Sequence, residues 1–192
     1  CTRAHIIMNR IKIPDFLISM NDIFKNAGFK AYLVGGAVRD MFMKKTPSDF
    51  DLATDAKPED VMRIFRRVIP TGISHGTVTV LFQKHEIEVT TFRAESSYSD
   101  GRHPDSISFA STIEEDLSRR DFTMNAIAVS LDGSGIVDPY NGQKDIKAKL
   151  IRTVGNPVER FSEDGLRPVR AIRFASGLNF KIDKDTLDAV SK

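Results

Sequence analysis

Hydrophobic side chains recur along the first half of the chain with two different periods. Between Pro14 and Asn26 they fall three and four residues apart, which is the spacing of one helix face, and Gly28 supplies a stop. Short apolar or alternating runs instead predict strands. The predicted order is helix 14–26, strand 31–34, helix 37–43, strand 50–52, helix 58–67, and paired strands 77–82 and 86–92.

The second half is predicted to be mostly helical after one polar loop. Residues 93–111 are polar and carry Gly101 and Pro104, which indicates a long mobile loop of the kind that is more often functional than idle. A helical pattern follows over 117–127, then a strand over 127–131. From Lys144 onward the pattern is helical with a break at 155–157. We therefore predict an N-terminal lead over 1–13, interpreted as a cloning remnant, an α+β unit over 14–149, and a helical region over 150–192.

Composition excludes several classes of protein. The chain has 192 residues, 41% hydrophobic and 28% charged, which is enough to bury a core and argues against disorder. No uncharged apolar run approaches the roughly 20 residues of a membrane span, so no membrane partner is expected. The single cysteine, Cys1, favours a reducing compartment, and the cytoplasm is the default location. A net charge of +2 neither indicates nor opposes a nucleic-acid partner.

The strongest local signal for chemistry is Asp49-Phe50-Asp51-Leu52. Alternation along a strand places both carboxylates on one face, about 7 Å apart, and turns Phe50 toward the core. Mg²⁺ prefers such hard oxygen ligands. An isolated pair of this kind is more often a solvated strand face, so the hypothesis depends on its neighbours. The four histidines are too scattered to suggest zinc.

Two neighbouring features favour a metal–phosphate site over a solvated face. Gly35-Gly36 lies between a predicted strand and a helix, where free backbone N–H groups favour phosphate, and Arg39 on the first helical turn adds a cation. A third carboxylate would complete a two-metal site. Glu88 is the candidate because it interrupts an apolar strand, where an unpaired carboxylate is costly. Glu86 is its rival on the same face.

Together these segments resemble the head of the tRNA CCA-adding nucleotidyltransferases of the bacterial and eukaryotic class, which includes the bacterial poly(A) polymerases. Five ordered motifs carry the resemblance, which spans roughly residues 31–178. The motifs are Gly35-Gly36-Ala37-Val38-Arg39-Asp40, Asp49-Phe50-Asp51-Leu52-Ala53-Thr54, Glu88-Val89-Thr90-Thr91-Phe92-Arg93, Arg119-Arg120-Asp121-Phe122-Thr123-Met124-Asn125-Ala126, and Arg160-Phe161-Ser162-Glu163-Asp164-Gly165-Leu166-Arg167, running on to Arg170-Ala171-Ile172-Arg173-Phe174.

The resemblance implies a fold and a set of roles. The fold would be an α+β head with a small mixed sheet, like that of DNA polymerase beta, followed by the first helices of an all-α neck. Catalytic Mg²⁺ would be held by the two strand carboxylates, with a third acidic residue beside them. The implied catalytic residues are Asp49, Asp51 and Glu88, the first two as metal ligands, and the implied nucleotide contacts in the head are Gly35, Gly36, Arg39, Arg120, Asp121 and Asn125. Asp121 and Asn125 would share one helical face.

The last motif would select the base. If it is helical, Asp164 and Arg167 are i, i+3 neighbours that can present an acceptor and a donor fork to a Watson–Crick edge. Arg170 and Arg173 would orient that edge or bind phosphate. Spacing alone favours a surface Asp–Arg ion pair over a base-reading edge. Pro168 departs from the family pattern, which has a helix-compatible residue at this position. Because proline opposes helix geometry around it, the helix would begin there or be kinked.

The implied activity is template-independent addition of C and A to the tRNA 3′ end from CTP and ATP, with release of pyrophosphate. Two alternatives stay open. Poly(A) polymerases and specialised CC-adding or A-adding enzymes share these motifs, and a catalytically silent nucleotide- or RNA-binding module is a rival of another class. Family members continue into further helical domains, so the chain is expected to be a fragment.

Overall fold

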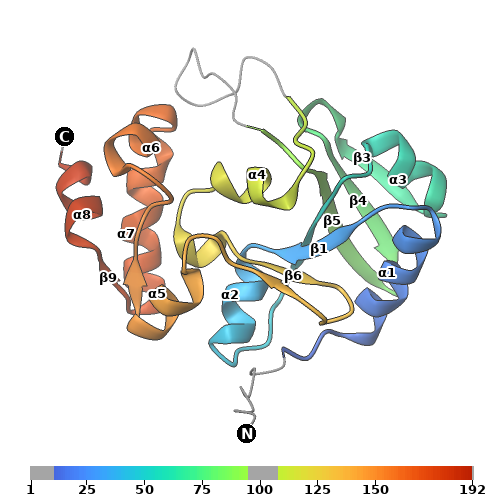
Figure 1. Ribbon diagram of the computed structural model, residues 1–192, viewed down its shortest axis with the longest axis horizontal. Coiled ribbons are helices and arrows are strands. Elements are labelled where there is room, and N and C mark those ends of the chain that lie inside the picture. Colours follow the sequence, from blue (N-terminus) through green and yellow to red (C-terminus); the bar gives the residue numbers. More distant parts are fainter. Residues whose placement is uncertain (1–10, 95–107, 192) are drawn as a thin grey trace, which may run out of the picture.

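The computed structural model describes residues 11–94 and 108–191, so the first ten residues of the predicted lead and residues 95–107 of the predicted loop lie outside the described residues. The described part centres on one mixed sheet of seven strands in the order β3-β4-β5-β2-β1-β6-β7 (Figure 1). The α+β fold class is thereby confirmed. The strands are β1 (Ala31–Val34), β2 (Phe50–Thr54), β3 (Val68–Gly72), β4 (Thr77–Phe82), β5 (His85–Thr91), β6 (Ala128–Ser130) and β7 (Ile136–Val137).

One parallel pairing distinguishes this sheet from a simple antiparallel meander. Strand β2 pairs in parallel with β5, whereas β1 pairs antiparallel with both β2 and β6. A parallel pair needs a long crossover. Here the crossover contains α3 (Pro58–Ile64), β3, the 3₁₀ turn η1 (Ile73–His75) and β4. The register of the parallel pair sets Asp51 opposite Glu88.

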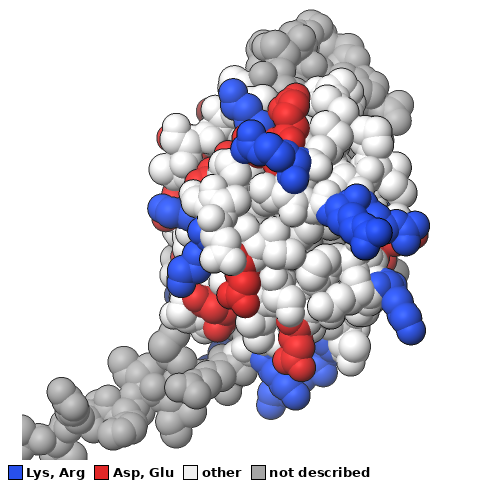
Figure 2. All heavy atoms as spheres, turned by 90° about the vertical axis from the view of Figure 1, so that its right-hand side faces the viewer, with Lys and Arg blue, Asp and Glu red and all other residues white. Residues whose placement is uncertain are grey.

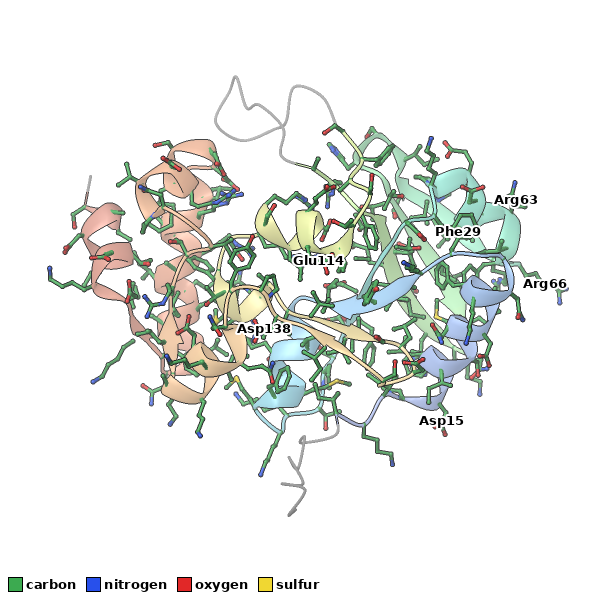
Figure 3. All side chains as sticks on the ribbon, in the orientation of Figure 1. Asp15, Phe29, Arg63, Arg66, Glu114 and Asp138 are labelled. Carbon is green, nitrogen blue, oxygen red and sulfur yellow. The ribbon has the colours of Figure 1, made fainter. Side chains whose placement is uncertain are left out.

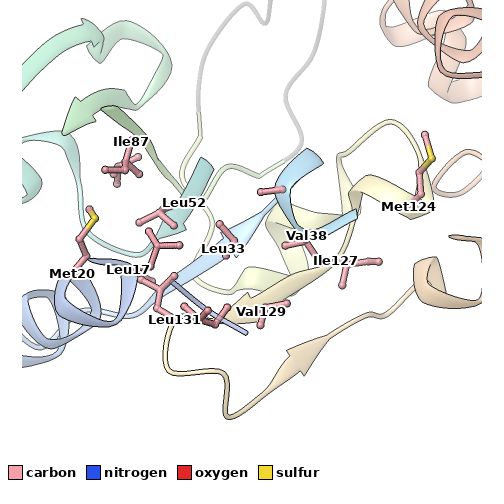
Figure 4. Close-up of a cluster of buried hydrophobic side chains, with 14 of the residues drawn as sticks. Leu17, Met20, Leu33, Val38, Leu52, Ile87, Met124, Ile127, Val129 and Leu131 are labelled. Atoms are coloured by element: carbon pink, nitrogen blue, oxygen red, sulfur yellow. The ribbon is translucent and has the colours of Figure 1, made fainter. Parts of the chain in front are cut away.

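The two faces of the sheet are covered by different helices, and side-chain alternation explains the division. One face carries Leu33, Leu52 and Val129, which share a buried cluster with residues of α1 (Asp15–Asn26), α2 (Gly36–Phe42) and the α3 segment (Figure 4). Their strand neighbours point to the opposite face, where helix α4 (Ile113–Ser118) packs. The second buried cluster comprises Val34, Ala53, Phe92, Ile113, Leu117, Ala126, Ala128 and Val154.

Residues 142–191 form a mostly helical layer beside the sheet (Figure 1). Phe161, Ala171 and Phe180 belong to the same buried cluster as the sheet residues, so the core is continuous across the predicted boundary near residue 150, which stays a prediction. None of the described helices is long and apolar enough to cross a membrane. The elements are α5 (Gly142–Ala148), β8 (Leu150–Ile151), α6 (Pro157–Glu163), α7 (Leu166–Leu178), β9 (Lys181–Ile182) and α8 (Lys184–Val190).

The helix predicted over 117–127 is wrong beyond its first residues. Helix α4 ends at Ser118, and only a 3₁₀ turn, η2 (Thr123–Asn125), follows. The backbone here pairs with a distant segment instead: the Thr123 N–H donates to the Arg152 carbonyl, and the Val154 N–H donates to the Asp121 carbonyl. Such long-range hydrogen bonds override helical periodicity. The short strands β3, β7, β8 and β9 were not predicted, and α3 ends at Ile64 rather than at residue 67.

The helical i, i+3 relation predicted for Asp164 and Arg167 is also wrong. Helix α6 ends at Glu163, Asp164 is extended (φ −143°, ψ 107°), and α7 begins at Leu166. Pro168 is therefore the third residue of α7. Its missing N–H costs nothing there, because the first turn of a helix has no intrahelical acceptor for it. The expectation that a helix begins near Pro168 is confirmed, and no kink is needed.

A pair of glycines tests the packing between α5 and η2. A Cβ on Gly142 would overlap the Thr123 carbonyl oxygen and the Ile127 side chain, whereas a Cβ on Gly177 in α7 would meet no atom within 4 Å. We expect Gly142→Ala to lower the free energy of unfolding by about 1–3 kcal/mol or more, as overpacking does. Gly177→Ala should raise it by about 0.5–1 kcal/mol, because alanine favours helices. Urea unfolding measures both, and equal effects would contradict this packing.

Candidate active site

A polar pocket of about 490 Å³ opens between the α4 face of the sheet and α7. Figure 3 shows α4, marked by Glu114, between the sheet and the C-terminal helices. The walls of the pocket come from segments that are far apart in the sequence. The pocket is lined by Val34, Gly35, Gly36, Arg39, Asp51, Leu52, Glu88, Thr90, Arg93, Arg119, Arg120, Asp121, Asn125, Asp164, Leu166, Arg167, Arg170 and Phe174.

The acidic side of the pocket comes from the parallel strand pair. Asp51 and Glu88 are register partners on β2 and β5, so they face the pocket together. Glu88 is exposed, so the expected cost of burying it does not arise. Asp49 lies just before β2, is exposed and, unlike Asp51 and Glu88, does not line the pocket; it accepts a 2.7 Å hydrogen bond from the Ser48 hydroxyl. Glu86 is exposed and does not line the pocket, which favours Glu88 over its rival.

These carboxylates suit a cation. Desolvation in the pocket, reinforced by the Glu88 and Asp49 charges, raises the pKa of Asp51 against the opposing influence of Arg120. A divalent cation would relieve that like-charge repulsion, and carboxylate oxygen is the donor type that Mg²⁺ prefers. Within residues 11–94 and 108–191, no group of three or more His, Cys, Asp or Glu side chains is already arranged to hold a metal ion.

The start of α2 supplies an open stretch of backbone next to Asp51. Gly35 has φ +71° and ψ −142°, a conformation that glycine adopts without strain. A Cβ placed there would lie 3.5 Å from Asp51 Oδ2 and 3.7 Å from Arg120 Nη1. Glycine thus leaves this corner of the pocket free of side chains. Arg39, one turn along α2, also lines the pocket and is tied to its neighbour Asp40 by a 2.8 Å ion pair.

A chain of polar contacts joins α2 to α7 across the pocket. Arg39 donates to Asn125 Oδ1 (3.2 Å), Asn125 donates to Asp121 Oδ1 (3.3 Å), and Arg170 donates two hydrogen bonds to Asp121 Oδ2 (2.9 and 2.7 Å). Asp121 and Asn125 therefore meet as expected, although through a 3₁₀ turn and not on a helix. The guanidiniums of Arg39 and Arg170 both lie over the Phe174 ring, 5.4 and 5.3 Å from its centroid.

The far edge of the pocket holds the predicted base-selecting residues. Asp164 Oδ1 accepts the Leu166 N–H (2.9 Å), which stabilises the break between α6 and α7. Arg167 is buried, and its two terminal nitrogens donate to Glu163 Oε2 and to the carbonyls of Arg160 and Arg119. Arg173 is exposed and lies outside the pocket lining, so the structure separates it from the other predicted residues.

The sequence patterns did not single out one residue that lies behind the basic wall of the pocket. Asp116 on α4 is 1% exposed and accepts hydrogen bonds from Arg120 Nε and Nη2 (3.2 and 2.9 Å) and from the Arg93 N–H (3.0 Å). Arg119 Nε lies 3.7 Å from Asp116 Oδ1, the oxygen that accepts the Arg93 N–H. Burial alone would raise the pKa of Asp116, but the Arg120 and Arg119 guanidiniums and the Arg93 N–H hold it below its usual value. The available signal was an acidic residue three and four positions before two arginines.

Comparison with known proteins agrees with this geometry. The family model described as "Poly A polymerase head domain" matches residues 31–152, which is more than half of the chain. The chain therefore belongs to that family. Among curated relatives, the CCA-adding enzyme of Bacillus subtilis is 51% identical over 88% of this chain, and that of Lactobacillus helveticus is 48% identical over 93%.

Superposition on solved structures agrees with the sequence comparisons. The Bacillus stearothermophilus CCA-adding enzyme in complex with CTP superposes with a TM-score of 0.84 at 44% identity, covering 91% of this chain and 42% of that one. A tRNA nucleotidyltransferase complexed with a primer tRNA and an incoming ATP analog superposes with a TM-score of 0.70 at 34% identity, covering 88% of this chain and 48% of that one. The chain spans less than half the length of the relatives it matches, 43% for the Bacillus subtilis enzyme and 45% for the Lactobacillus helveticus enzyme.

The lowered pKa of Asp116 predicts a specific dependence of stability on pH. A carboxyl whose pKa is lower in the folded state stabilises the fold above its unfolded pKa, about 3.9, and loses that contribution as pH falls through the folded value. Asp116→Asn should therefore lower the free energy of unfolding by about 3 kcal/mol at pH 7. The difference from the unmodified protein should shrink below about pH 4. Urea unfolding from pH 7 to pH 3 measures this, and a constant difference would contradict the assignment.

Proposed function

We propose that this chain is the catalytic head and the first neck helices of a template-independent nucleotidyltransferase that adds C and A to the 3′ end of tRNA, using CTP and ATP and releasing pyrophosphate. The observation that carries the proposal is the composition of one pocket: paired carboxylates on its sheet side, arginines along its walls, and Asp164 at its far edge. The CTP named for one structural relative and the primer tRNA and ATP analog named for another supply the substrate classes.

The reaction joins the terminal 3′ oxygen of the tRNA to the α-phosphate of the incoming nucleotide and breaks the bond to pyrophosphate. Asp49, Asp51 and Glu88 are proposed as its catalytic residues, with Asp49 and Asp51 as ligands of Mg²⁺. When bound, Mg²⁺ would neutralise the developing phosphate charge and lower the pKa of the attacking hydroxyl. Metal and positioning supply most of the catalysis in such transfers.

The remaining pocket residues are proposed to bind and orient the nucleotide. The Gly35-Gly36 backbone leaves room for the triphosphate, and Arg39 and Arg120 are close enough to contribute positive charge to it. Asp121 and Asn125 are proposed as ribose contacts. Their mutual hydrogen bond and the Arg170 fork hold both side chains at the pocket wall.

Base selection is proposed to begin with Asp164. Its Oδ1 is committed to the Leu166 N–H, and a second carboxylate oxygen is available to accept from a base amino group. Arg167 anchors this segment through its inward hydrogen bonds, so it would contact a base only by exchanging one of them. Arg173, which lies outside the pocket, is better placed for a phosphate of the RNA than for the nucleotide.

The tRNA itself needs more surface than one pocket. The face shown in Figure 2, on the side of α1 and α3, carries basic and acidic side chains interspersed, and the net charge is only +2. Affinity for nucleic acid comes mainly from many cationic contacts with phosphates. The experiment that tests the proposed function therefore incubates the full-length protein with tRNA lacking its 3′ end and with single nucleoside triphosphates.

Product length separates the outcomes of that experiment. Addition that stops after C, C and A supports the proposal, whereas long A tails or addition of C or A alone would assign one of the related activities. Nucleotide binding without any Mg²⁺-dependent incorporation would contradict the proposal and favour a silent binding module.

Glu88 and Glu86 offer a matched pair for the catalytic assignment. Both are exposed on β5, but only Glu88 lines the pocket. Glu88→Gln and Asp51→Asn should each lower Mg²⁺-dependent incorporation by roughly 100-fold or more, because they remove charge beside the reacting phosphate. Glu86→Gln should leave the rate within a factor of two or so of the unmodified protein, as a surface change does. Equal rates for the Glu88 and Glu86 variants would remove Glu88 from the active site.

Replacement of Asp164 tests base selection separately from triphosphate binding. Asp164→Ala should raise misincorporation of UTP and GTP relative to CTP and ATP by roughly 5- to 150-fold, the effect of losing about 1–3 kcal/mol from a hydrogen bond. Binding of inorganic triphosphate should stay unchanged, because the phosphates are assigned to other residues. Single-nucleotide incorporation assays measure the ratio. If UTP and GTP remain as well rejected as before, Asp164 does not select the base.

A further inference from the structure

Asp116 sits behind the pocket rather than in it. Its side chain is 1% exposed and is not part of the pocket lining, yet its hydrogen-bond and ion-pair partners Arg93, Arg119 and Arg120 all line that pocket. These residues come from the end of β5 and from the segment that follows α4. One buried carboxylate therefore ties together three residues of the basic wall.

The contact with Asp116 fixes the orientation of the Arg120 guanidinium as well as its position. Nε and Nη2 of Arg120 both donate to Asp116 Oδ2, at 3.2 and 2.9 Å. A planar guanidinium held by two of its nitrogens has no rotational freedom left for the third. That third nitrogen, Nη1, lies 3.7 Å from where a Cβ on Gly35 would be, in the corner next to Asp51. Arg120 is thus aimed at the place proposed for the triphosphate.

The second oxygen of Asp116 holds the neighbouring backbone. Oδ1 accepts the Arg93 N–H at 3.0 Å, and Arg119 Nε lies 3.7 Å from the same oxygen. The carboxylate therefore links α4 to the end of β5, the strand that carries Glu88. A carboxylate accepts on both oxygens, whereas an asparagine in its place would keep one acceptor and present an amide donor to the other partner.

From this geometry we infer that Asp116 is a positioning residue for the incoming nucleotide: it orients Arg120 toward the triphosphate without touching the nucleotide itself. The inference rests on the proposed function, because it assigns the Gly35 corner to the triphosphate. The expected effect of losing Asp116 on nucleotide binding is selective. Loss of Asp116 should weaken the recognition of β- and γ-phosphates and leave recognition of the base and ribose largely intact.

The test measures binding of CTP and CMP to the folded full-length protein with Mg²⁺ at pH 7, by calorimetry. Asp116→Asn should weaken CTP binding by about 10- to 100-fold, the range for losing a hydrogen bond between charged groups. CMP binding should change by less than about 3-fold, within the error of independent sites. Asp145→Asn is the control for the loss of a buried, ion-paired carboxylate: Asp145 pairs with Arg152, accepts from the Thr123 hydroxyl (2.7 Å) and lies outside the pocket lining, so its loss should not weaken CTP binding more than CMP binding.

A double-mutant cycle separates positioning from a general loss of structure. If Asp116 acts through Arg120, then Asp116→Asn should have no further effect on CTP affinity in an Arg120→Ala background. Additive losses, or equal losses for CTP and CMP, would overturn the inference. If the unmodified protein binds no CTP, the proposed function fails first, and this outcome is distinct from the others.

A second variant keeps the inference testable if Asp116→Asn does not fold. Arg120→Lys keeps the charge but replaces the planar fork with a single ammonium group, which cannot both engage Asp116 in two hydrogen bonds and reach the Gly35 corner. Its CTP affinity should fall by about 10-fold or more while CMP binding is retained. Unchanged CTP affinity in this folded variant would contradict the role of the fork and overturn the inference.

Discussion

The parallel pairing of β2 with β5 is the constraint on which the rest of the site depends. It is the contact that brings Asp51 opposite Glu88, although 36 residues of sequence lie between them. Because side chains alternate across a strand, the same pairing that buries Leu52 against the helices of one face turns Asp51 and Glu88 to the other face. A shift of one residue in register would reverse this arrangement and expose the core, so the position of the carboxylates is coupled to the stability of the sheet.

The neighbouring negative charges of Asp51 and Glu88 repel each other, and cations on the surrounding elements offset that repulsion. Arg120 opposes the rise in the pKa of Asp51, and Asp116 in turn holds Arg120. Helix α7 closes the pocket from the far side, where Arg170 is fixed by Asp121 and lies over Phe174. The site is therefore one polar network that spans the sheet, α4 and α7, in which Arg120 and Arg170 are each held by a more buried carboxylate. Such preorganisation lowers the cost of orienting charged groups around a bound phosphate.

Local patterns were sufficient for much of this architecture. Apolar spacing predicted α1, α2, β1, β4 and β5 close to their observed bounds, and of the Asp49-Phe50-Asp51 motif Asp51 lines the acidic side of the pocket. Long-range contacts and one local side-chain hydrogen bond decided the rest. Residues 119–127 have helical spacing, but their backbone pairs with the segment around Arg152. The break at Asp164 depends on a side-chain hydrogen bond to Leu166, and Asp116 gains its role only because Arg93 and Arg120 converge on it. The backbone pairing with Arg152 and the contact between Arg93 and Asp116 have no signature in the linear sequence, whereas the spacing of Asp116 before Arg119 and Arg120 does.

The proposed function requires this pocket to bind a nucleoside triphosphate with its phosphates toward Gly35 and its base toward Asp164. A crystal structure of the protein with CTP and Mg²⁺ tests it most directly. We expect triphosphate density beside Gly35, Arg39 and Arg120, metal density between the phosphates and Asp51, and the cytosine near Asp164. A nucleotide bound with the opposite orientation, or outside this pocket, would contradict the proposed function of this site.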